Sequence, residues 1–340
     1  MTNKLQRILV CPLDWGLGHA SRCIPLIYAF LAEGHEVFLA GSGTSATLLK
    51  QTFPTLPFIP FESFTLRYSS GSSQVWAVLK ALPHLFKRIQ TERKELATIV
   101  KEHRITQVVS DNRFGCYCQD VKSIYITHQV CVKLPFPFGF LEPLVARWHR
   151  NIMEKYDECW IPDFQELERS LAGKLSHPKR IPANAQYIGP LSRFKTEVKH
   201  DVLDSDSVIG SASKMPKQFQ GSTLTLAILS GVEPQRSIFE RYLLDSLQLE
   251  PTDKVVLVQG LPQHGCTPYY VGKVEVYPSL DTTTLQALVQ QASRIICRSG
   301  YSTVMDMHAL GKLPACTFVP TPGQPEQEYL AAYLRTKNLG

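Results

Sequence analysis

The feature that most constrains the fold is an apolar segment that runs into a glycine-rich turn and then into an apolar helix. Residues 7–13 are typical of a short buried strand, the turn after them holds Gly16 and Gly18, and residues 23–33 predict a helix. Residues 35–40 predict a second strand. Such a β-α-β unit builds a parallel sheet that is covered by helices, so the chain begins as an α/β domain.

The same alternation continues in two series. The first predicts helices at 80–104 and 143–155 and strands at 107–110, 123–127 and 159–162. The second predicts strands at 224–229, 254–259, 273–277 and 294–297, with helices from about 236 and at 283–291. Between the two series, residues 201–221 are rich in Ser, Asp, Lys and Gly and lack periodicity, which indicates a linker or a surface insertion.

A chain of 340 residues is long enough for two such domains. We predict doubly wound, Rossmann-like domains at 1–195 and 223–340, joined by a linker at 196–222, with ligands in the cleft between the carboxyl ends of their strands. A compact α/β domain normally ends in a completed element. The stop at Gly340, soon after a helix holding residues 329–334, therefore indicates a chain that is trimmed or lacks a final helix.

Charge and composition exclude several classes of protein. The formal net charge is +6, and Lys and Arg are scattered without a basic run interleaved with aromatic residues, so no nucleic-acid partner is predicted. The densest basic stretch, residues 80–104, alternates charged and apolar residues at helical spacing. It predicts the solvated face of an amphipathic helix, and a face resting on anionic lipid is the alternative.

Cysteine usage and hydropathy indicate the compartment. The nine cysteines, an odd number without a CxxC pair or a zinc-like spacing with His, predict free thiols in a reducing environment. No apolar run approaches the ~18–20 residues that a membrane span needs. We expect a cytoplasmic protein, with peripheral contact at the inner face of the membrane as the alternative.

The first glycine-rich turn, residues 14–22, carries a candidate catalytic group. Amides at a helix start favour an anion or a polar transition state. Ser21 stands where a dinucleotide fingerprint has its third glycine, and no acidic residue follows the second strand, so NAD binding is not predicted. His19 is expected to project into the cleft and take a proton from an acceptor hydroxyl, with Gly16 and Gly18 beside it on the acceptor side. The alternative is a histidine bonded to backbone.

Polar residues follow two further strands: Asp111, Asn112 and Arg113 after the strand at 107–110, and His128 and Gln129 after the strand at 123–127. We expect these side chains to point into the cleft on the acceptor side, with Asp111 as the second candidate for the general base. A group of apolar residues lies downstream, namely Phe136, Phe138, Phe140, Leu144 and Trp148. It predicts buried packing, with an apolar wall for a lipid acceptor as the alternative.

The densest pattern lies near the end, where a strand at 294–297 is followed by a Ser-Gly turn and a helix. The amides around Ser299, Gly300, Ser302 and Thr303 can cradle a diphosphate without a metal. Asp306 falls about one turn into the helix, where its carboxylate can accept hydrogen bonds from a ribose diol. The alternative for the isolated pattern is a helix cap.

Residues 297–306, Cys-Arg-Ser-Gly-Tyr-Ser-Thr-Val-Met-Asp, resemble the Cys-Arg-Ser-Gly-x-x-Thr-x-x-Glu donor motif of the MurG-like glycosyltransferases, glycosyltransferase family 28. Residues 16–19 are similar to that family's Gly-x-Gly-Gly-His loop. The resemblance covers nearly the whole chain. It implies the GT-B fold, with two Rossmann-like domains facing a cleft, and a donor such as UDP-N-acetylglucosamine.

The resemblance also implies roles for single residues. Asp306 would hold the ribose, and Leu280 would lie against the uracil edge. Other donor contacts are implied for Ser230, Gly231 and Arg236, which match a phosphate loop in position, for Arg298 in the donor motif, and for Glu326 and Gln327, which match an acidic-Gln pair. Residues 127–130, Thr-His-Gln-Val, stand where the family has His-Glu-Gln-Asn, so the acceptor stays open between lipid-linked and saccharide.

Together these patterns predict an inverting transferase that uses a UDP-sugar as co-substrate, with His19 or Asp111 as base and without a cofactor or metal. The only Asp-x-Asp pattern considered, Asp204 and Asp206, falls in the predicted linker. Two alternatives remain, a UDP-sugar epimerase and a non-catalytic protein that binds sugar nucleotides.

Overall fold

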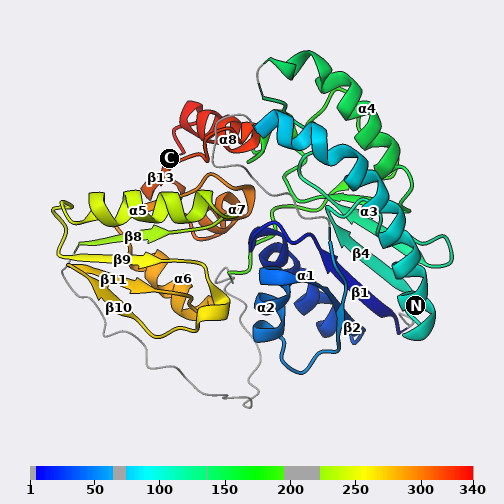
Figure 1. Cartoon of the computed structure of the whole chain (residues 1–340), viewed down its shortest axis with the longest axis horizontal. Coiled ribbons are helices and arrows are strands. Elements are labelled where there is room, and N and C mark those ends of the chain that lie inside the picture. Colours follow the sequence, from blue (N-terminus) through cyan, green and yellow to red (C-terminus); the bar gives the residue numbers. More distant parts are fainter. Residues whose placement is uncertain (1–4, 64–73, 136, 195–222, 340) are drawn as a thin grey trace.

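The computed structural model describes residues 5–63, 74–135, 137–194 and 223–339. These residues form two helix-covered sheets, one from each half of the chain, that lie side by side (Figure 1). The predicted α/β class with two parallel-dominated sheets is confirmed. The predicted linker at 196–222, with Asp204 and Asp206, and Phe136 lie outside the described residues.

The N-terminal sheet has seven strands in the order β3-β2-β1-β4-β5-β6-β7, and all neighbouring pairs are parallel. The strands are β1 Arg7–Pro12, β2 Glu36–Gly41, β3 Phe58–Pro60, β4 Gln107–Asp111, β5 Lys122–Ile126, β6 Glu158–Ile161 and β7 Ala185–Tyr187. The helices are α1 Gly18–Ala32, α2 Gly43–Thr52, α3 Gln74–Glu102 and α4 Glu142–Met153. The order 3-2-1-4-5-6 is that of a Rossmann sheet.

The C-terminal sheet has the order β10-β11-β9-β8-β12-β13, parallel except for the β10–β11 pair at one edge. Its strands are β8 Leu224–Ile228, β9 Lys254–Val258, β10 Tyr269–Val271, β11 Val274–Tyr277, β12 Arg294–Cys297 and β13 Cys316–Phe318. Its helices are α5 Gln235–Leu247, α6 Thr282–Gln291, α7 Tyr301–Ala309 and α8 Pro325–Thr336. Short 3₁₀ helices lie at Phe138–Leu141, Gly173–Leu175, Pro262–His264 and Leu313–Ala315.

The central strand β1 shows how the N-terminal sheet is held. Successive side chains point to opposite faces, so Ile8 and Val10 pack in the cluster that includes Ile24 of α1. Leu9 packs on the other face in the cluster that includes Leu96 of α3. Each fully buried side chain of this size contributes roughly 1.5–3 kcal/mol. The sheet edge where the β1 and β4 strands end is thereby held rigid.

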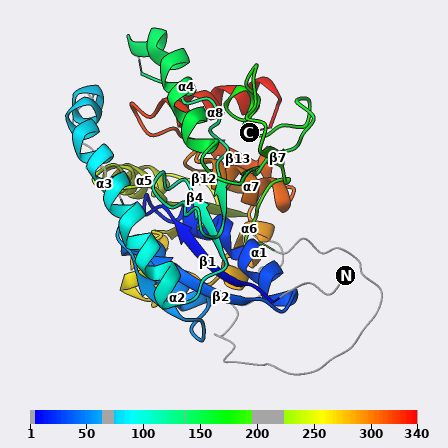
Figure 2. The same ribbon diagram turned by 90° about the vertical axis from the view of Figure 1, so that its right-hand side faces the viewer.

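The two halves of the chain share a core. Leu171, Leu175 and Phe194, which follow β6, are buried in one cluster with Leu226 of β8 and Val304 of α7. The last helix, α8, returns to the N-terminal half (Figures 1 and 2), where Tyr333 donates a hydrogen bond to the Ser170 carbonyl. The two sheets are therefore joined by packing as well as by the chain.

Some elements differ from those that the sequence predicts. Helix α1 begins at Gly18, five residues before the predicted start, and α2 and the short strands β3, β7, β10 and β13 were not predicted. Helix α2 opens with Gly43, Thr44 and Ser45, which are weak helix formers. Asp14, in the turn after β1, caps this helix by accepting a hydrogen bond from the Ser45 amide at 3.2 Å. None of the described helices is long and apolar enough to cross a membrane.

Candidate active site

Five polar side chains meet where the two halves of the chain face one another, and we call them the catalytic cluster: His19, Arg22, Asp111, His128 and Glu326. His19 and Arg22 lie in the first turns of α1, Asp111 ends β4, and His128 follows β5. Glu326 comes from the first turn of α8. Strands β1 and β4 pair with Pro12 opposite Asp111, so the helix that follows β1 starts beside that carboxylate.

Asp111 is the buried centre of the cluster. Its side chain is 0% exposed. Arg22 donates a hydrogen bond from Nε to Oδ2 and another from Nη2 to Oδ1. His19 Nδ1 lies 2.8 Å from Asp111 Oδ1. Burial by itself raises the pKa of Asp111, but the charge of Arg22 and then that of His19 outweigh it and lower the pKa to about 2. Asp111 is therefore ionised across the neutral range.

His19 Nδ1 lies 2.8 Å from both Asp111 Oδ1 and Arg22 Nη2. A carboxylate only accepts and a guanidinium only donates, so the two contacts favour opposite tautomers. We assign the proton to Nδ1, because Arg22 Nη2 already donates to Asp111 Oδ1. Nε2 is left with its lone pair, and it bonds to no other residue that the structure describes. The His19 side chain is 15% exposed, so the ring is not fully enclosed by protein. This arrangement suits a general base.

His128 links the cluster to the other half of the chain. Its Nδ1 accepts from Arg22 Nη1 at 3.0 Å, because a guanidinium only donates, so Nε2 carries the proton that goes to Glu326 Oε1 at 2.8 Å. The ring stacks on Tyr301 with centroids 4.2 Å apart, and Gln129 also donates to Glu326. Burial lowers the pKa of His128, although Glu326 opposes the shift, so the ring is neutral at neutral pH.

Glycine-rich loops from the two halves touch beside the cluster. A Cβ on Gly16, whose φ is +73°, would lie 3.5 Å from Gly231 Cα. A Cβ on Gly18 would lie 3.0 Å from Ser302 Oγ, and that hydroxyl donates to the Gly18 carbonyl at 2.8 Å. A side chain on Gly18 would therefore crowd Ser302, whereas at Gly16 the positive φ is what disfavours a side chain. The predicted phosphate loop at 230–231, the start of α7 and the first glycine-rich turn converge on one place.

Comparisons with known proteins bear on what this site does. No protein-family model matches the chain. Two curated relatives, each described as an uncharacterized glycosyltransferase, come from Methanosarcina mazei and Methanosarcina acetivorans. They are 25% and 24% identical to this chain over 98% of its length and 84% of theirs. The likeness therefore extends through both sheets.

Solved structures agree with the sequence relatives. The glycosyltransferase of kitacinnamycin has a TM-score of 0.59 at 14% identity and covers 99% of this chain and 86% of its own. The spinosyn rhamnosyltransferase SpnG, complexed with thymidine diphosphate, has a TM-score of 0.58 at 16% identity, with coverages of 97% and 84%. Arabidopsis thaliana UGT89C1, complexed with UDP-L-rhamnose, has a TM-score of 0.53 at 13% identity, with coverages of 98% and 90%.

The protein is a glycosyltransferase of the GT-B type. The closer resemblance to family 28 remains a prediction that rests on the motif at 297–306. In open α/β sheets ligands bind beyond the carboxyl ends of the strands, and Asp111 of the catalytic cluster lies at the carboxyl end of β4. Among the described residues, no three His, Cys, Asp or Glu side chains are grouped so that they could hold a metal ion.

The predicted donor motif has a structural part in this glycosyltransferase. Arg298 lies over the Phe239 ring at 3.8 Å and donates to the Pro320 carbonyl at 2.9 Å. Ser299 donates to the Gln327 carbonyl at 2.7 Å, and Gln327 Oε1 accepts from the Thr321 amide at 2.9 Å. The polar groups of Arg298 and Gln327 are engaged by these contacts, and donor binding by the two residues stays a prediction. They hold the segment at 319–327 against the start of α7.

The Asp306 carboxylate is engaged by protein groups in this structure, and its predicted ribose role stays a prediction. Its Oδ1 accepts from Ser192 Oγ at 2.7 Å and from the Arg193 amide at 3.3 Å, and its Oδ2 lies 3.3 Å from Arg193 Nε. The reason is that residues 192–194 cross α7 on their way out of the N-terminal half. Burial raises the pKa of Asp306, although Arg193 opposes the shift. A ribose would have to displace two residues.

Two predicted acceptor-side residues also point elsewhere. Arg113 is 1% exposed, pairs with Glu92 at 3.0 Å and lies over the Phe61 ring, because α3 covers that face of the sheet. Asn112 has a φ of +58° and accepts from Tyr125 at 2.9 Å, so it shapes the turn after β4. The prediction that these side chains line the cleft is corrected.

Some of the remaining predicted donor residues lie where the two halves meet, and the others pack within the C-terminal half. Ser230 and Gly231 lie on the loop that meets Gly16, and Gly300 and Thr303 lie at the start of α7. Arg236 is 7% exposed and pairs with Glu233 and Glu240 at 2.7 and 2.8 Å, so its charge is already compensated. Leu280 is partly buried against the C-terminal core.

Arg22 is the member of the catalytic cluster that sequence reasoning missed. A signal was present, because an arginine between Ser21 and Cys23 occupies an otherwise apolar helix face, one turn after His19. Charged residues are rarely buried unless they are paired. An arginine at this position therefore required a buried acceptor.

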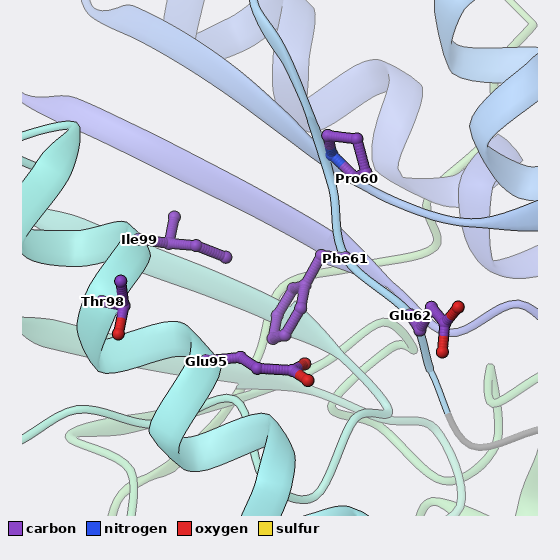
Figure 3. Close-up of a pocket in the computed structure, with 6 residues that line it drawn as sticks. All are labelled: Pro60, Phe61, Glu62, Glu95, Thr98 and Ile99. Carbon is purple, nitrogen blue, oxygen red and sulfur yellow. The ribbon is translucent and has the colours of Figure 1, made fainter.

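Hollows elsewhere in the described structure do not involve the catalytic cluster. One of about 470 Å³ lies between the end of β3 and helix α3 and is lined by Pro60, Phe61, Glu62, Glu95, Thr98 and Ile99 (Figure 3). Another of about 450 Å³ lies at the amino ends of the N-terminal strands, beside His35 and Trp160. Neither contains a residue predicted for the site.

Proposed function

We propose that this glycosyltransferase moves a hexose, N-acetylglucosamine or a related sugar, from a UDP-sugar to an acceptor hydroxyl, with inversion and without a metal. The observation that carries the proposal is the 2.8 Å contact of His19 Nδ1 with the ionised Asp111, while Nε2 bonds to no other described residue. Nucleotides in two similar structures, thymidine diphosphate and UDP-L-rhamnose, support a nucleoside-diphosphate sugar as donor. The family 28 resemblance favours uridine and N-acetylglucosamine.

The proposed step uses His19 as the general base. Nε2 takes the proton of the acceptor hydroxyl while its oxygen forms a bond to the anomeric carbon. The bond from that carbon to the diphosphate oxygen breaks, and UDP leaves with the electron pair. Attack from the face opposite UDP inverts the anomeric centre. The imidazolium that forms is stabilised by Asp111 at 2.8 Å.

Asp111 is better suited to orient His19 than to act as the base. The carboxylate is fully buried, both of its oxygens are held by Arg22, and its pKa of about 2 makes it a weak base. A base with a pKa far below the working pH contributes little to proton transfer. We therefore assign proton transfer to His19 and orientation to Asp111.

We propose that the diphosphate lies where the loop at 230–231 meets the start of α7. Helix α7 begins at Tyr301 with Gly300 as its N-cap, and its unpaired amides and dipole favour an anion. Gly16 and Gly18 approach from the other half of the chain without side chains in the way. Backbone amides in this position would meet the charge that develops on UDP, which is the role a metal plays in other transferases.

An apolar patch supports an acceptor at an anionic lipid surface. Phe140 and Leu144, on the 3₁₀ helix and α4, are 74% and 65% exposed, while Trp148 packs on Phe86 of α3. Arg147 is exposed on the same helix. Apolar side chains beside a cation suit a lipid interface. Binding to phosphatidylglycerol vesicles that Leu144→Asp abolishes would support this, and equal binding to neutral vesicles would contradict it.

The function can be tested in two stages. A thermal-shift screen of UDP-, TDP- and GDP-sugars identifies the donor, because a ligand at a hundredfold excess over Kd adds about 2.7 kcal/mol to stability. Nucleotide release is then measured with panels of lipid and saccharide acceptors. Turnover without an acceptor that yields an epimer would favour the epimerase alternative, and binding without any turnover would favour a non-catalytic protein.

The role of His19 is tested with the same assay. We expect His19→Ala to lower kcat by ~10²–10⁴-fold and to leave donor affinity unchanged, because the donor is proposed to bind the other half of the chain. His19→Ala with wild-type turnover, together with loss of turnover in Asp111→Asn, would exchange the two roles.

A further inference from the structure

Arg22 is the charged member of the catalytic cluster to which the proposed mechanism gives no part. Its side chain is 2% exposed. It donates to both oxygens of Asp111, its Nη2 lies 2.8 Å from His19 Nδ1, and its Nη1 lies 3.0 Å from His128 Nδ1. The Arg22 guanidinium therefore contacts three residues: His19, the proposed base; Asp111, which orients it; and His128, which contacts the other half of the chain.

The geometry of these contacts requires an arginine. A planar fork that donates two parallel hydrogen bonds fixes the plane of a carboxylate, which a lysine ammonium cannot do. With Asp111 held in that plane, its Oδ1 faces His19 Nδ1. A buried carboxylate without a paired cation would instead tend to take up a proton, and it would then lose much of its hold on the His19 ring.

His19 lies among charges of opposite sign. Asp111 on β4 and Glu326 on α8 are anionic, and Arg22 on α1 is cationic. His128, after β5, is neutral and contributes no charge at neutral pH. Arg22 is thus the cation of the cluster that lies against the His19 ring, at 2.8 Å from Nδ1.

We propose that Arg22 is a positioning residue for the base. It keeps Asp111 ionised and oriented, and its charge beside the His19 ring keeps Nε2 free to accept the acceptor's proton. Arg22 also contacts His128, whose Nε2 lies 2.8 Å from Glu326 Oε1 in the other half of the chain. The hydrogen bonds from Arg22 to Asp111 are therefore linked to the contact between the two halves. The inference rests on the proposed role of His19 as base.

The first test needs no substrate. The ring carbons of histidine are labelled with ¹³C, the His19 signal is assigned with His19→Gln, and its titration is followed by NMR in wild type and Arg22→Met. We expect the midpoint to move to higher pH by about 1–3 units in Arg22→Met, because a unit charge about 4 Å away at an effective dielectric near 20 has an effect of this order. Since His19 and Asp111 are in direct contact, the midpoint belongs to the pair.

Two variants serve as controls. Arg22→Lys keeps the charge but loses the fork, so we expect a midpoint within about half a unit of wild type and a lower kcat. Arg113→Met removes another buried arginine of the N-terminal half, which pairs with Glu92 and not with the cluster. It matches the loss of packing and should leave the His19 midpoint in place. The acid limb of kcat/KM should move with the NMR midpoint in every variant.

The proposal is overturned if folded Arg22→Met titrates within 0.3 pH units of wild type, or if Arg113→Met moves the midpoint as far as Arg22→Met does. If Arg22→Met does not fold, Arg22→Gln is compared with Arg22→Lys. A midpoint that rises in Gln alone supports the charge effect, and equal midpoints refute it. An active His19→Ala enzyme would instead refute the proposed function, whatever the titrations show.

Discussion

Replacing Asp306 with alanine separates a structural role from a ligand-binding role. In the structure the carboxylate is 5% exposed and accepts from Ser192 and Arg193, which join the N-terminal half to α7. Removing one partner of a buried pair costs about 3–5 kcal/mol. The Arg193 side chain is 15% exposed, so water can partly replace the lost contact, and the lower end, about 3 kcal/mol, is expected.

The assay is equilibrium unfolding of Asp306→Ala, with Asp306→Asn as the matched control. At about 2–4 °C per kcal/mol, a loss of 3 kcal/mol lowers Tm by about 6–12 °C. Asn keeps an oxygen for Ser192 and removes a buried charge, so its loss should be smaller. Calorimetric titration with UDP and 2′-deoxy-UDP follows on the folded variants. The reasoning would be refuted if Asp306→Ala were as stable as wild type but no longer bound UDP more tightly than 2′-deoxy-UDP. That result would support a role of Asp306 in binding the ribose.

Three further predictions are independent of Asp306. EDTA should leave turnover unchanged, and a loss that Mg²⁺ or Mn²⁺ restores would contradict metal independence. The pKa of Asp111 in the folded protein lies below its usual value of 3.8, so the ionised carboxylate stabilises the fold above that pH. This contribution is lost as the pH falls from about 4 to 2. In Asp111→Asn, the free energy of unfolding measured with urea should therefore depend less on pH over that range. Gly115→Ala places a Cβ 2.5 Å from the Ile89 carbonyl and should cost about 1–3 kcal/mol, and an unchanged urea midpoint would contradict this.

Much of the fold could be predicted from local pattern. The strands β1, β4, β8 and β12 and the helices α5 and α6 begin within a residue or two of the predicted positions, because their apolar periodicity and end signals lie within the segment itself. The position of His19 at a strand-turn-helix junction has the same local origin. What these segments could not indicate is which other segments they would meet.

The tertiary structure decided the features whose partners are far away in the chain. Helix α2 depends on a cap from Asp14, and three-residue strands such as β3 and β13 gain order by pairing with a neighbouring strand. Glu326 meets His128 across 198 residues, and Asp306 meets Ser192 across 114. The pairing of Arg22 with Asp111 likewise spans 89 residues. Residue types and local periodicity specify the helices and strands. A charged side chain, however, can be buried only where a remote group of the chain pairs with it. Which group that is becomes fixed only when the two halves of the chain pack together.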